Sequence, residues 1–134
     1  YPERGDTIQY QIYFESGGGG EHALNLHFFA NGPPYADAYV LEINNIGPLF
    51  RIIDQNDFSG VSDQPNSIPN NEWLSVTITT TSSAISATLE DANGTEISSI
   101  TFNDTTYSSG ELSWRYFANN SSADAGYVDE FTLS

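Results

Sequence analysis

The chain has no lysine and no cysteine, and only three arginines offset its 18 aspartates and glutamates, so that 134 residues carry a formal charge of −15. Without cysteine it can form no disulfide, thiolate metal site or thiol nucleophile. So few cations offer little attraction to phosphate backbones or anionic lipid headgroups. No apolar run is long enough to span a bilayer. We therefore expect neither nucleic acid nor membrane insertion among its interactions.

The excess of acid also predicts where the protein works. Repulsion between unscreened carboxylates opposes a compact state, whereas at molar salt the Debye length falls to about 3 Å and the repulsion is screened. An acidic protein from a low-salt habitat normally carries lysine on exposed strands, where it blocks edge pairing. The sequence thus predicts a salt-adapted protein from a halophilic source.

The sequence pattern is that of an all-β protein. Apolar residues recur with a period of two in segment after segment, and Gly, Pro, Asn, Asp and Ser fill the breaks. About nine strands at this spacing predict a two-sheet sandwich. We expect one domain, residues 1–134, excised from a longer protein whose other domains are its partners. Strands are predicted for Asp6–Glu15, Glu21–Ala30, Tyr39–Asn44, Leu49–Asp54, Trp73–Thr80, Ala84–Glu90, Ile97–Phe102, Glu111–Ala118 and Gly126–Ser134.

Four segments carry more specific predictions. Gly17–Gly20 predicts a flexible hairpin tip, because four glycines hold no regular conformation cheaply. Asp91–Gly94 predicts a tight hairpin, because Asn-Gly accepts the positive φ that such turns need. Gln55–Asn71 has few apolar residues and is predicted to be a long surface connection. Glu111–Ala118 is partly apolar on both faces, which predicts a strand in the middle of a sheet.

Read together, four segments resemble the concanavalin A-like lectin and glucanase superfamily, in its laminin-G-like branch: Arg4–Ile8, Glu72–Ile78, Ala87–Ile97 and Tyr127–Phe131. The resemblance spans nearly the whole chain. It implies an antiparallel jelly-roll sandwich that binds glycans or proteins outside the cell, on the cell surface of a haloarchaeon or on the surface of a virion. Among carbohydrate-binding modules the chain is most similar to the fructan-binding type, in which an arginine and carboxylates grip a terminal sugar. It also implies that Trp73 packs in the core.

Sugar recognition combines aromatic rings, which stack on sugar faces, with arginine, amide and carboxylate groups, which bond the hydroxyls. Arg51 and Arg115 lie in strands rich in aromatics, and each is expected to pair with specific carboxylates. A buried structural ion pair is the open alternative for each arginine, and a place in the core is the alternative for Trp114. The predicted carbohydrate-binding residues are Arg51, Arg115, Tyr39, Trp114, Asp54 and Glu111.

Other residues bear on metal binding and catalysis. The resemblance implies a structural calcium ion, held by Asp129 of the closing strand and Asp6 near the first strand, although Asp129 fits an exposed strand position equally well. The glucanase pattern Glu-x-Asp-x-x-Glu is absent from the sequence. His22 and His27 have opposite parity in one strand and cannot easily converge on a catalytic or zinc site. The protein is therefore predicted not to be an enzyme.

The predicted function is a non-catalytic, lectin-like module with a carbohydrate or a glycoprotein as its partner. The alternative is a structural or adhesion domain that mediates assembly or host attachment on a cell surface or a virion. A patch that combines aromatic rings with an arginine–carboxylate pair would favour the first function. An exposed apolar patch larger than a few hundred Å² would favour the second.

Salt should stabilise the protein strongly. We expect the melting temperature to rise as NaCl goes from tens of millimolar to molar, because the repulsion within a chain of charge −15 is then screened. Circular dichroism melts measure this, with sucrose as a control that favours burial without screening charge. A melting temperature indifferent to NaCl would contradict salt adaptation.

Overall fold

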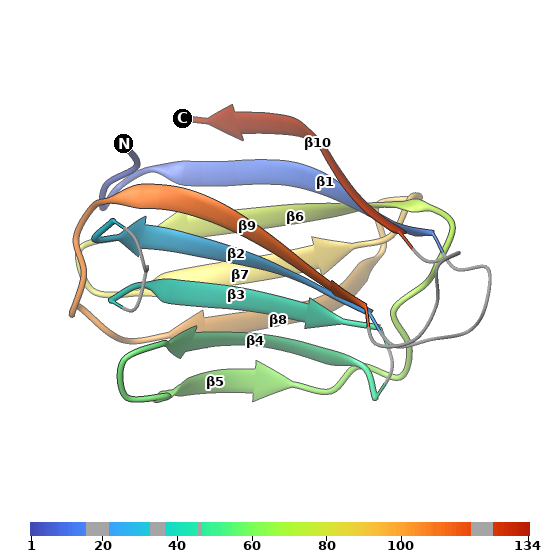
Figure 1. The fold of residues 1–134 in the computed structure, drawn as a ribbon, viewed down its shortest axis with the longest axis horizontal. Helices are drawn as coiled ribbons and strands as arrows, with labels where there is room; N and C mark the ends of the chain where they lie inside the picture. Colours follow the sequence, from blue (N-terminus) through green and yellow to red (C-terminus); the bar gives the residue numbers. More distant parts are fainter. Residues whose placement is uncertain (16–21, 33–36, 46, 119–124) are drawn as a thin grey trace.

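The computed structural model describes residues 1–15, 22–32, 37–45, 47–118 and 125–134, in which the regular structure is β-strand. Figure 1 shows these strands in two stacked layers. No helix in this part of the chain is long and apolar enough to cross a membrane. The strands are β1 (Thr7–Glu15), β2 (His22–Ala30), β3 (Tyr39–Asn44), β4 (Leu49–Asp54), β5 (Gly60–Asp63), β6 (Trp73–Thr80), β7 (Ile85–Glu90), β8 (Glu96–Phe102), β9 (Glu111–Ala118) and β10 (Ala125–Leu133).

Each layer is a sheet of five strands. Sheet I has the order β10-β1-β6-β7-β8, and sheet II has the order β5-β4-β3-β2-β9. Every pair of neighbouring strands is antiparallel. Consecutive strands pair within sheet II from β2 to β5 and within sheet I from β6 to β8, while the other connections change sheet. The predicted all-β, antiparallel jelly-roll sandwich is confirmed.

The core lies between the two sheets. Because successive side chains of a strand point to opposite faces, the apolar set of each strand faces inward. On β1 these side chains are Ile8, Ile12 and Phe14, and they belong to one cluster with Leu26 and Phe50 of sheet II. Burial of a side chain of this size stabilises the fold by about 1.5–3 kcal/mol. With no disulfide to help, this packing carries most of the stability.

Two strand predictions need correction. Gly17–Gly20 lies outside the described residues, but the strands on either side of it are not a hairpin, because β1 belongs to sheet I and β2 to sheet II. The predicted connection Gln55–Asn71 contains an edge strand, β5, which pairs with β4. A side chain at Gly60 would collide with the backbone of Ile52 and Ile53. The glycine at the start of β5 therefore allows the backbone of β5 to approach that of β4 closely.

The hairpin predicted at Asp91–Gly94 is present between β7 and β8. Gly94 has a φ of +80°, which a glycine adopts without strain. The carboxylate of Asp91 closes the turn, because its Oδ1 accepts hydrogen bonds from the backbone N–H groups of Asn93 and Thr95, each at 2.9 Å.

β9 is an edge strand rather than the predicted central strand, because it pairs only with β2. Across the gap between the sheets it faces β10, the edge strand of sheet I: the Trp114 and Phe131 rings lie 6.2 Å apart, and the Tyr116 ring covers the backbone of Gly126. No further strand covers this side of the sandwich in the described residues, and the apolar side chains between β9 and β10 are partly exposed. We call this side the open edge and define it by five apolar side chains that are 37–42% exposed: Trp114, Tyr116, Val128, Phe131 and Leu133.

Arg4 closes one end of the sandwich. Its guanidinium donates from Nη2 to the Tyr39 hydroxyl of sheet II at 2.8 Å and to the Asp104 carbonyl at 2.7 Å. From Nε it donates to the Tyr107 carbonyl at 3.0 Å, and from Nη1 to the Thr81 carbonyl, beside sheet I, at 3.3 Å. One cation thus ties the start of the chain to both sheets and to the segment between β8 and β9.

Tyr39 and Asp104 complete this network. The Tyr39 hydroxyl donates to Asp104 Oδ1 at 2.6 Å and accepts from the Tyr107 N–H at 3.2 Å. Burial, followed by the bond to Asp104, raises the pKa of Tyr39 to about 12. Burial alone would raise the pKa of Asp104, but hydrogen bonds from Tyr39 and Thr106 and the charge of Arg4 outweigh it and lower that pKa. The network therefore favours the ionised form of Asp104.

The network should give the protein a specific acid sensitivity. Because the pKa of Asp104 is lower in the folded state, its contribution is complete above the unfolded value of about 3.9 and is lost as the pH falls through the folded value. We expect Asp104→Asn to cost about 1–2 kcal/mol at pH 7, a modest figure because Asp104 is partly exposed. At a pH below the folded value the difference should shrink toward zero.

Urea unfolding of both proteins at each pH, in constant molar salt, measures this difference. Glu96→Gln is the matched control, because it removes one negative charge from an exposed position. A cost of Asp104→Asn that stays the same at both pH values would show that the ionised carboxylate contributes nothing.

Candidate functional site

The structure brings Arg51 and Arg115 to the same face. In sheet II, Arg51 is paired with Glu42, Glu42 with Asn25, and Asn25 with Arg115. We call these four residues the arginine row. Their neighbours along β4, β3 and β2 are buried between the sheets, so the row itself points outward. The Cα atoms of the two arginines are roughly 14 Å apart, because three strand spacings separate them.

Glu42 and Arg51 form a partly exposed ion pair. Arg51 Nε and Nη2 lie 2.7 and 2.6 Å from the same oxygen, Glu42 Oε1. The two side chains are 38% and 16% exposed. Within the described residues Glu42 Oε2 and Arg51 Nη1 have no hydrogen-bond partner, which leaves one acceptor and one donor facing solvent side by side. Such a pair adds little stability, typically below about 1 kcal/mol.

The middle of the face holds two polar atoms that lack partners among the described residues. Asn25 Oδ1 and His27 Nδ1 are buried, yet neither makes a hydrogen bond. Burial lowers the pKa of His27 and the positive charge of Arg115 adds to this shift, while the nearby Gln55 side chain opposes it. His27 is therefore neutral at pH 7. Buried polar atoms without partners are uncommon in proteins, and a ligand that supplies hydroxyl groups would satisfy them.

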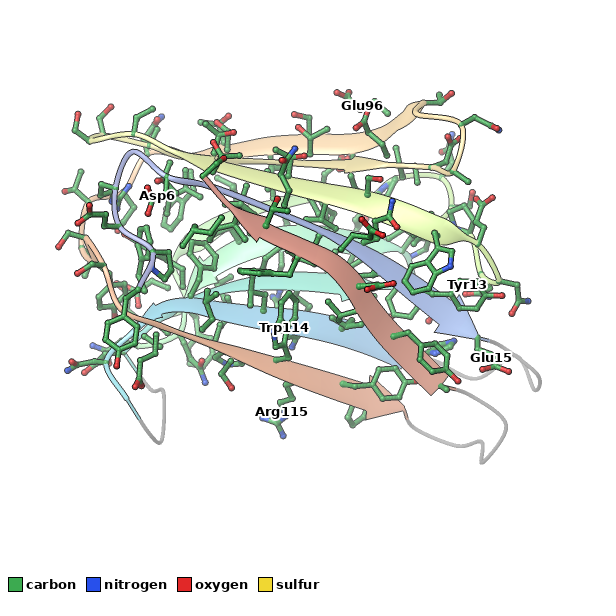
Figure 2. The ribbon with its side chains drawn as sticks, turned by 90° about the horizontal axis from the view of Figure 1, so that it is seen from above. Asp6, Tyr13, Glu15, Glu96, Trp114 and Arg115 are labelled. Carbon is green, nitrogen blue, oxygen red and sulfur yellow. The ribbon has the colours of Figure 1, made fainter. Side chains whose placement is uncertain are left out.

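Arg115 lies on β9, the edge strand of sheet II, at one end of the arginine row. Its side chain is exposed, and it forms no ion pair within the described residues. Figure 2 shows Trp114 and Arg115 on opposite sides of β9, with Trp114 directed between the sheets. The half-exposed ring of Phe117 follows Arg115 on the same side of the strand and pairs with Ala23 of β2. An arginine and an aromatic ring thus stand together at this end of the arginine row.

The other predicted sugar-binding residues lie elsewhere. Tyr39 is fully buried, with 0% exposure, and belongs to the Arg4 network. Asp54 is also buried, and its Oδ1 accepts a hydrogen bond from the Tyr107 hydroxyl at 2.7 Å. Trp114 packs edge-on against Tyr10 at 4.7 Å and lies in the open edge. The structure therefore separates these side chains from the two arginines.

Glu111 lies at the start of β9, away from the arginine row. Together with Tyr1, Asn31 and Gly32 it lines a hollow of about 350 Å³. Its Oε1 accepts a long hydrogen bond of 3.4 Å from the Tyr1 hydroxyl, and its buried Oε2 has no partner in the described part of the chain. This hollow is a separate feature of the surface.

Four residues of the face were not predicted: Glu42, Asn25, His27 and Phe117. Glu42 could have been found, because the loop between Asn44 and Leu49 sets a hairpin register that places position 42 opposite Arg51. The acids chosen from the sequence, Asp54 and Glu111, are near the arginines along the chain but not across the sheet.

The carboxylates expected to hold calcium do not come together. Asp129 pairs with Gln11, five positions after Asp6 on β1, which puts the two acids roughly 17 Å apart. Each already accepts a local hydrogen bond at 2.8 Å, Asp6 from the Glu3 N–H and Asp129 from the Glu130 N–H. The described residues contain no group of three His, Cys, Asp or Glu that could hold a metal ion. Asp6 and Asp129 do not fit a shared ion.

Trp73 does not pack in the core, contrary to the expectation from the family resemblance. It begins β6 on the outer face of sheet I and is 38% exposed.

Comparison with known proteins identifies the fold but no family. No protein-family model and no curated protein matches the sequence. Among solved structures, the carbohydrate-binding module CBM66 from Bacillus subtilis matches with a TM-score of 0.69 and 14% identity over 98% of this chain and 83% of that one. Sheep galectin-11, in complex with glycerol, matches with a TM-score of 0.66 and 9% identity over 96% and 89%. Chicken galectin 2 matches with a TM-score of 0.59 and 11% identity over 98% and 92%.

The chain has a lectin-like jelly-roll fold. The fold is the one that the sequence resemblance implied. At such low identities the likeness shows the fold alone.

Removal of calcium should leave the protein unchanged. Because Asp6 and Asp129 are roughly 17 Å apart, no single ion can bind both, and we expect EDTA to leave the melting temperature unaltered at fixed salt. Differential scanning calorimetry with and without EDTA, on the wild type and on Asp129→Asn, measures this. A lower melting temperature in EDTA would reveal a calcium site built from other ligands.

Proposed function

We propose that this protein is a non-catalytic carbohydrate-binding module and that sugar binds on the outer face of sheet II. The arginine row carries this proposal: two of the three cations in a chain of charge −15 lie on one face, beside a carboxylate and an amide. The solved structures of similar fold include one named as a carbohydrate-binding module and others named as galectins, which supports the ligand class.

The groups on this face complement sugar hydroxyls. The planar guanidinium of Arg51 donates hydrogen bonds from a fixed geometry, while Glu42 Oε2 accepts a hydrogen bond from a hydroxyl. Asn25 Oδ1 and His27 Nδ1 are buried atoms that a hydroxyl would satisfy. At the far end Arg115 donates to further hydroxyls, and Phe117 offers a ring to the apolar face of a sugar. Each polar group is matched by something that a sugar supplies.

The same proposal includes the setting. The charge of −15 and the lack of lysine support a salt-adapted, extracellular module of a haloarchaeal surface protein or a virion, attached to other domains of its parent. In such a setting the arginine row acts as a local cationic feature on an otherwise acidic surface. An anionic glycan would find only two arginines on this face, one of which is already paired with Glu42, so the ligand that fits is uncharged.

Substitution of the row should abolish binding without unfolding the protein. We expect Arg51→Gln and Glu42→Gln each to weaken sugar binding at least roughly tenfold, and to change stability by less than about 1 kcal/mol because the pair is partly exposed. Arg115→Gln should behave in the same way. A glycan array in molar salt that includes fructans, read beside the melting temperature of each variant, measures both quantities, with Glu96→Gln as the charge control.

Unchanged glycan binding by folded Arg51→Gln and Arg115→Gln would show that the arginines are structural and that the site lies elsewhere.

An assembly domain remains the second candidate, and the open edge favours it. Five half-exposed apolar side chains in a row, on two edge strands with unpaired backbone, could pair with another chain. Light scattering on the array sample separates the candidates. A monomer that binds glycans supports the module, whereas an oligomer that Phe131→Ser dissociates, with no glycan bound, supports assembly.

A further inference from the structure

A row of three aromatic rings crosses the outer face of sheet I, on the side of the molecule opposite the arginine row. Tyr13 of β1 is paired with Trp73 of β6 on one side and with Tyr127 of β10 on the other. The ring centroids are 5.3 Å apart for Tyr13 and Trp73, and 6.1 Å apart for Tyr13 and Tyr127. We call these residues the aromatic row. Their neighbours Ile12, Phe14 and Leu74 fill the core, so the row itself faces outward.

The aromatic row forms a place for a ligand. Its three side chains are the whole lining of a hollow of about 380 Å³. Trp73 and Tyr127 are 38% and 47% exposed, a large apolar area to leave in water. The Tyr127 hydroxyl donates to Glu15 Oε2 at 2.8 Å, which places a polar pair at the rim. Figure 2 shows Tyr13 and Glu15 together at one end of β1.

The face continues along β1 and β6 as a polar track. A second hollow, of about 330 Å³, is lined by the amides of Gln9 and Gln11 and the hydroxyls of Ser75, Thr77 and Thr132, with the carboxylates of Glu90 and Glu130 on its flanks. Gln11 and Ser75 form the next pair after the aromatic row, and Gln9 and Thr77 the pair after that. Gln9 lies four positions before Tyr13 along β1, so the track is roughly 13 Å long.

Charge decides what this track can bind. Although the chain has 18 acids, β6 has none, and β1 has only Glu15 at its end. No arginine lies on this face: Arg51 and Arg115 belong to sheet II, and Arg4 is held in its network. An anionic ligand would find no cation here and a strongly acidic molecule around it. A cationic peptide would find carboxylates only on the flanking strands, Glu90 on β7 and Asp129 and Glu130 on β10, and none on β1 or β6 between Gln9 and Tyr13.

We propose that the outer face of sheet I is a second carbohydrate site, which binds an uncharged polysaccharide chain along β1 and β6. One sugar packs its apolar face on the aromatic row, and the following sugars receive hydrogen bonds from the Gln9 and Gln11 amides and the Ser75 and Thr77 hydroxyls. This inference takes its ligand class partly from the proposed function, but its residues are independent of the arginine row.

The two tryptophans allow a direct test, because Trp73 lies in the aromatic row and Trp114 in the open edge. In Trp114→Phe all indole fluorescence comes from Trp73, and in Trp73→Phe it comes from Trp114. Titration with xylan, galactomannan and levan, with alginate as the anionic comparison, is expected to shift the emission of Trp114→Phe and to leave that of Trp73→Phe nearly unchanged. Alginate should have no effect on either.

Variants then locate the site. Trp73→Ala and Tyr13→Ala are expected to lower the affinity for the neutral polysaccharide at least roughly tenfold while the melting temperature stays within a few degrees. Phe58→Ala is the matched control, because it removes an exposed ring outside the track. The double variant Arg51→Gln/Arg115→Gln should keep its polysaccharide affinity on sheet I.

Three results would overturn the inference: no binding of any neutral polysaccharide by the wild type, unchanged binding by folded Trp73→Ala, or a dimer that Trp73→Ala dissociates without loss of sugar binding. The proposed function is judged separately. If the arginine variants lose array binding while Trp73→Ala does not, only the second site fails. If Trp73→Ala loses polysaccharide while the arginine variants bind normally, the second site stands and the arginine row fails.

Discussion

The guanidinium of Arg4 is the interaction on which the sandwich depends at its closed end. It donates to carbonyls beside sheet I, to a hydroxyl of sheet II and to the segment that leads into β9. Its charge also lies 5.5 Å from the Tyr39 ring centre and 5.7 Å from that of Phe29, so the aromatic end of the core packs around a cation. Loss of this one group would leave the part-buried carbonyls of Tyr107 and Asp104 without this donor and would remove the cation beside the ionised Asp104. The position of β9, and hence of Arg115, follows from it.

The distribution of the three arginines divides the molecule into regions of different chemistry. Arg4 is used inside the closed end, where it has structural partners. Arg51 and Arg115 both lie on the outer face of sheet II. The outer face of sheet I has no cation, and its strands β1 and β6 present amides, hydroxyls and aromatic rings instead. The chain has 18 acids, yet the outward residues of β1 and β6 are almost all uncharged. The overall composition therefore does not explain the polarity of this part of the surface.

The strands could be predicted because their apolar residues alternate with a period of two, which backbone geometry alone imposes. β5 could not, since it has a single apolar residue, Val61, and its pairing depends on the close approach that Gly60 allows. The pairing of Arg51 with Glu42 is local and follows from a hairpin register. The pairing of Asn25 with Arg115 joins distant parts of the chain, so no sequence pattern specifies it. For the same reason the edge position of β9 and the outward position of Trp73 were missed.

β10 pairs with β1 along almost its whole length, and Thr7 and Ser134 exchange both of their backbone hydrogen bonds. Sheet I is therefore complete only when β10, the last strand of the chain, has paired with β1, the first. Closing so long a loop is slow compared with forming the hairpins between β6 and β8. During that interval the outer edge of β1 is open to pairing with other copies. At low salt, mutual repulsion between chains of charge −15 slows such encounters, so the charge also protects the folding chain against aggregation.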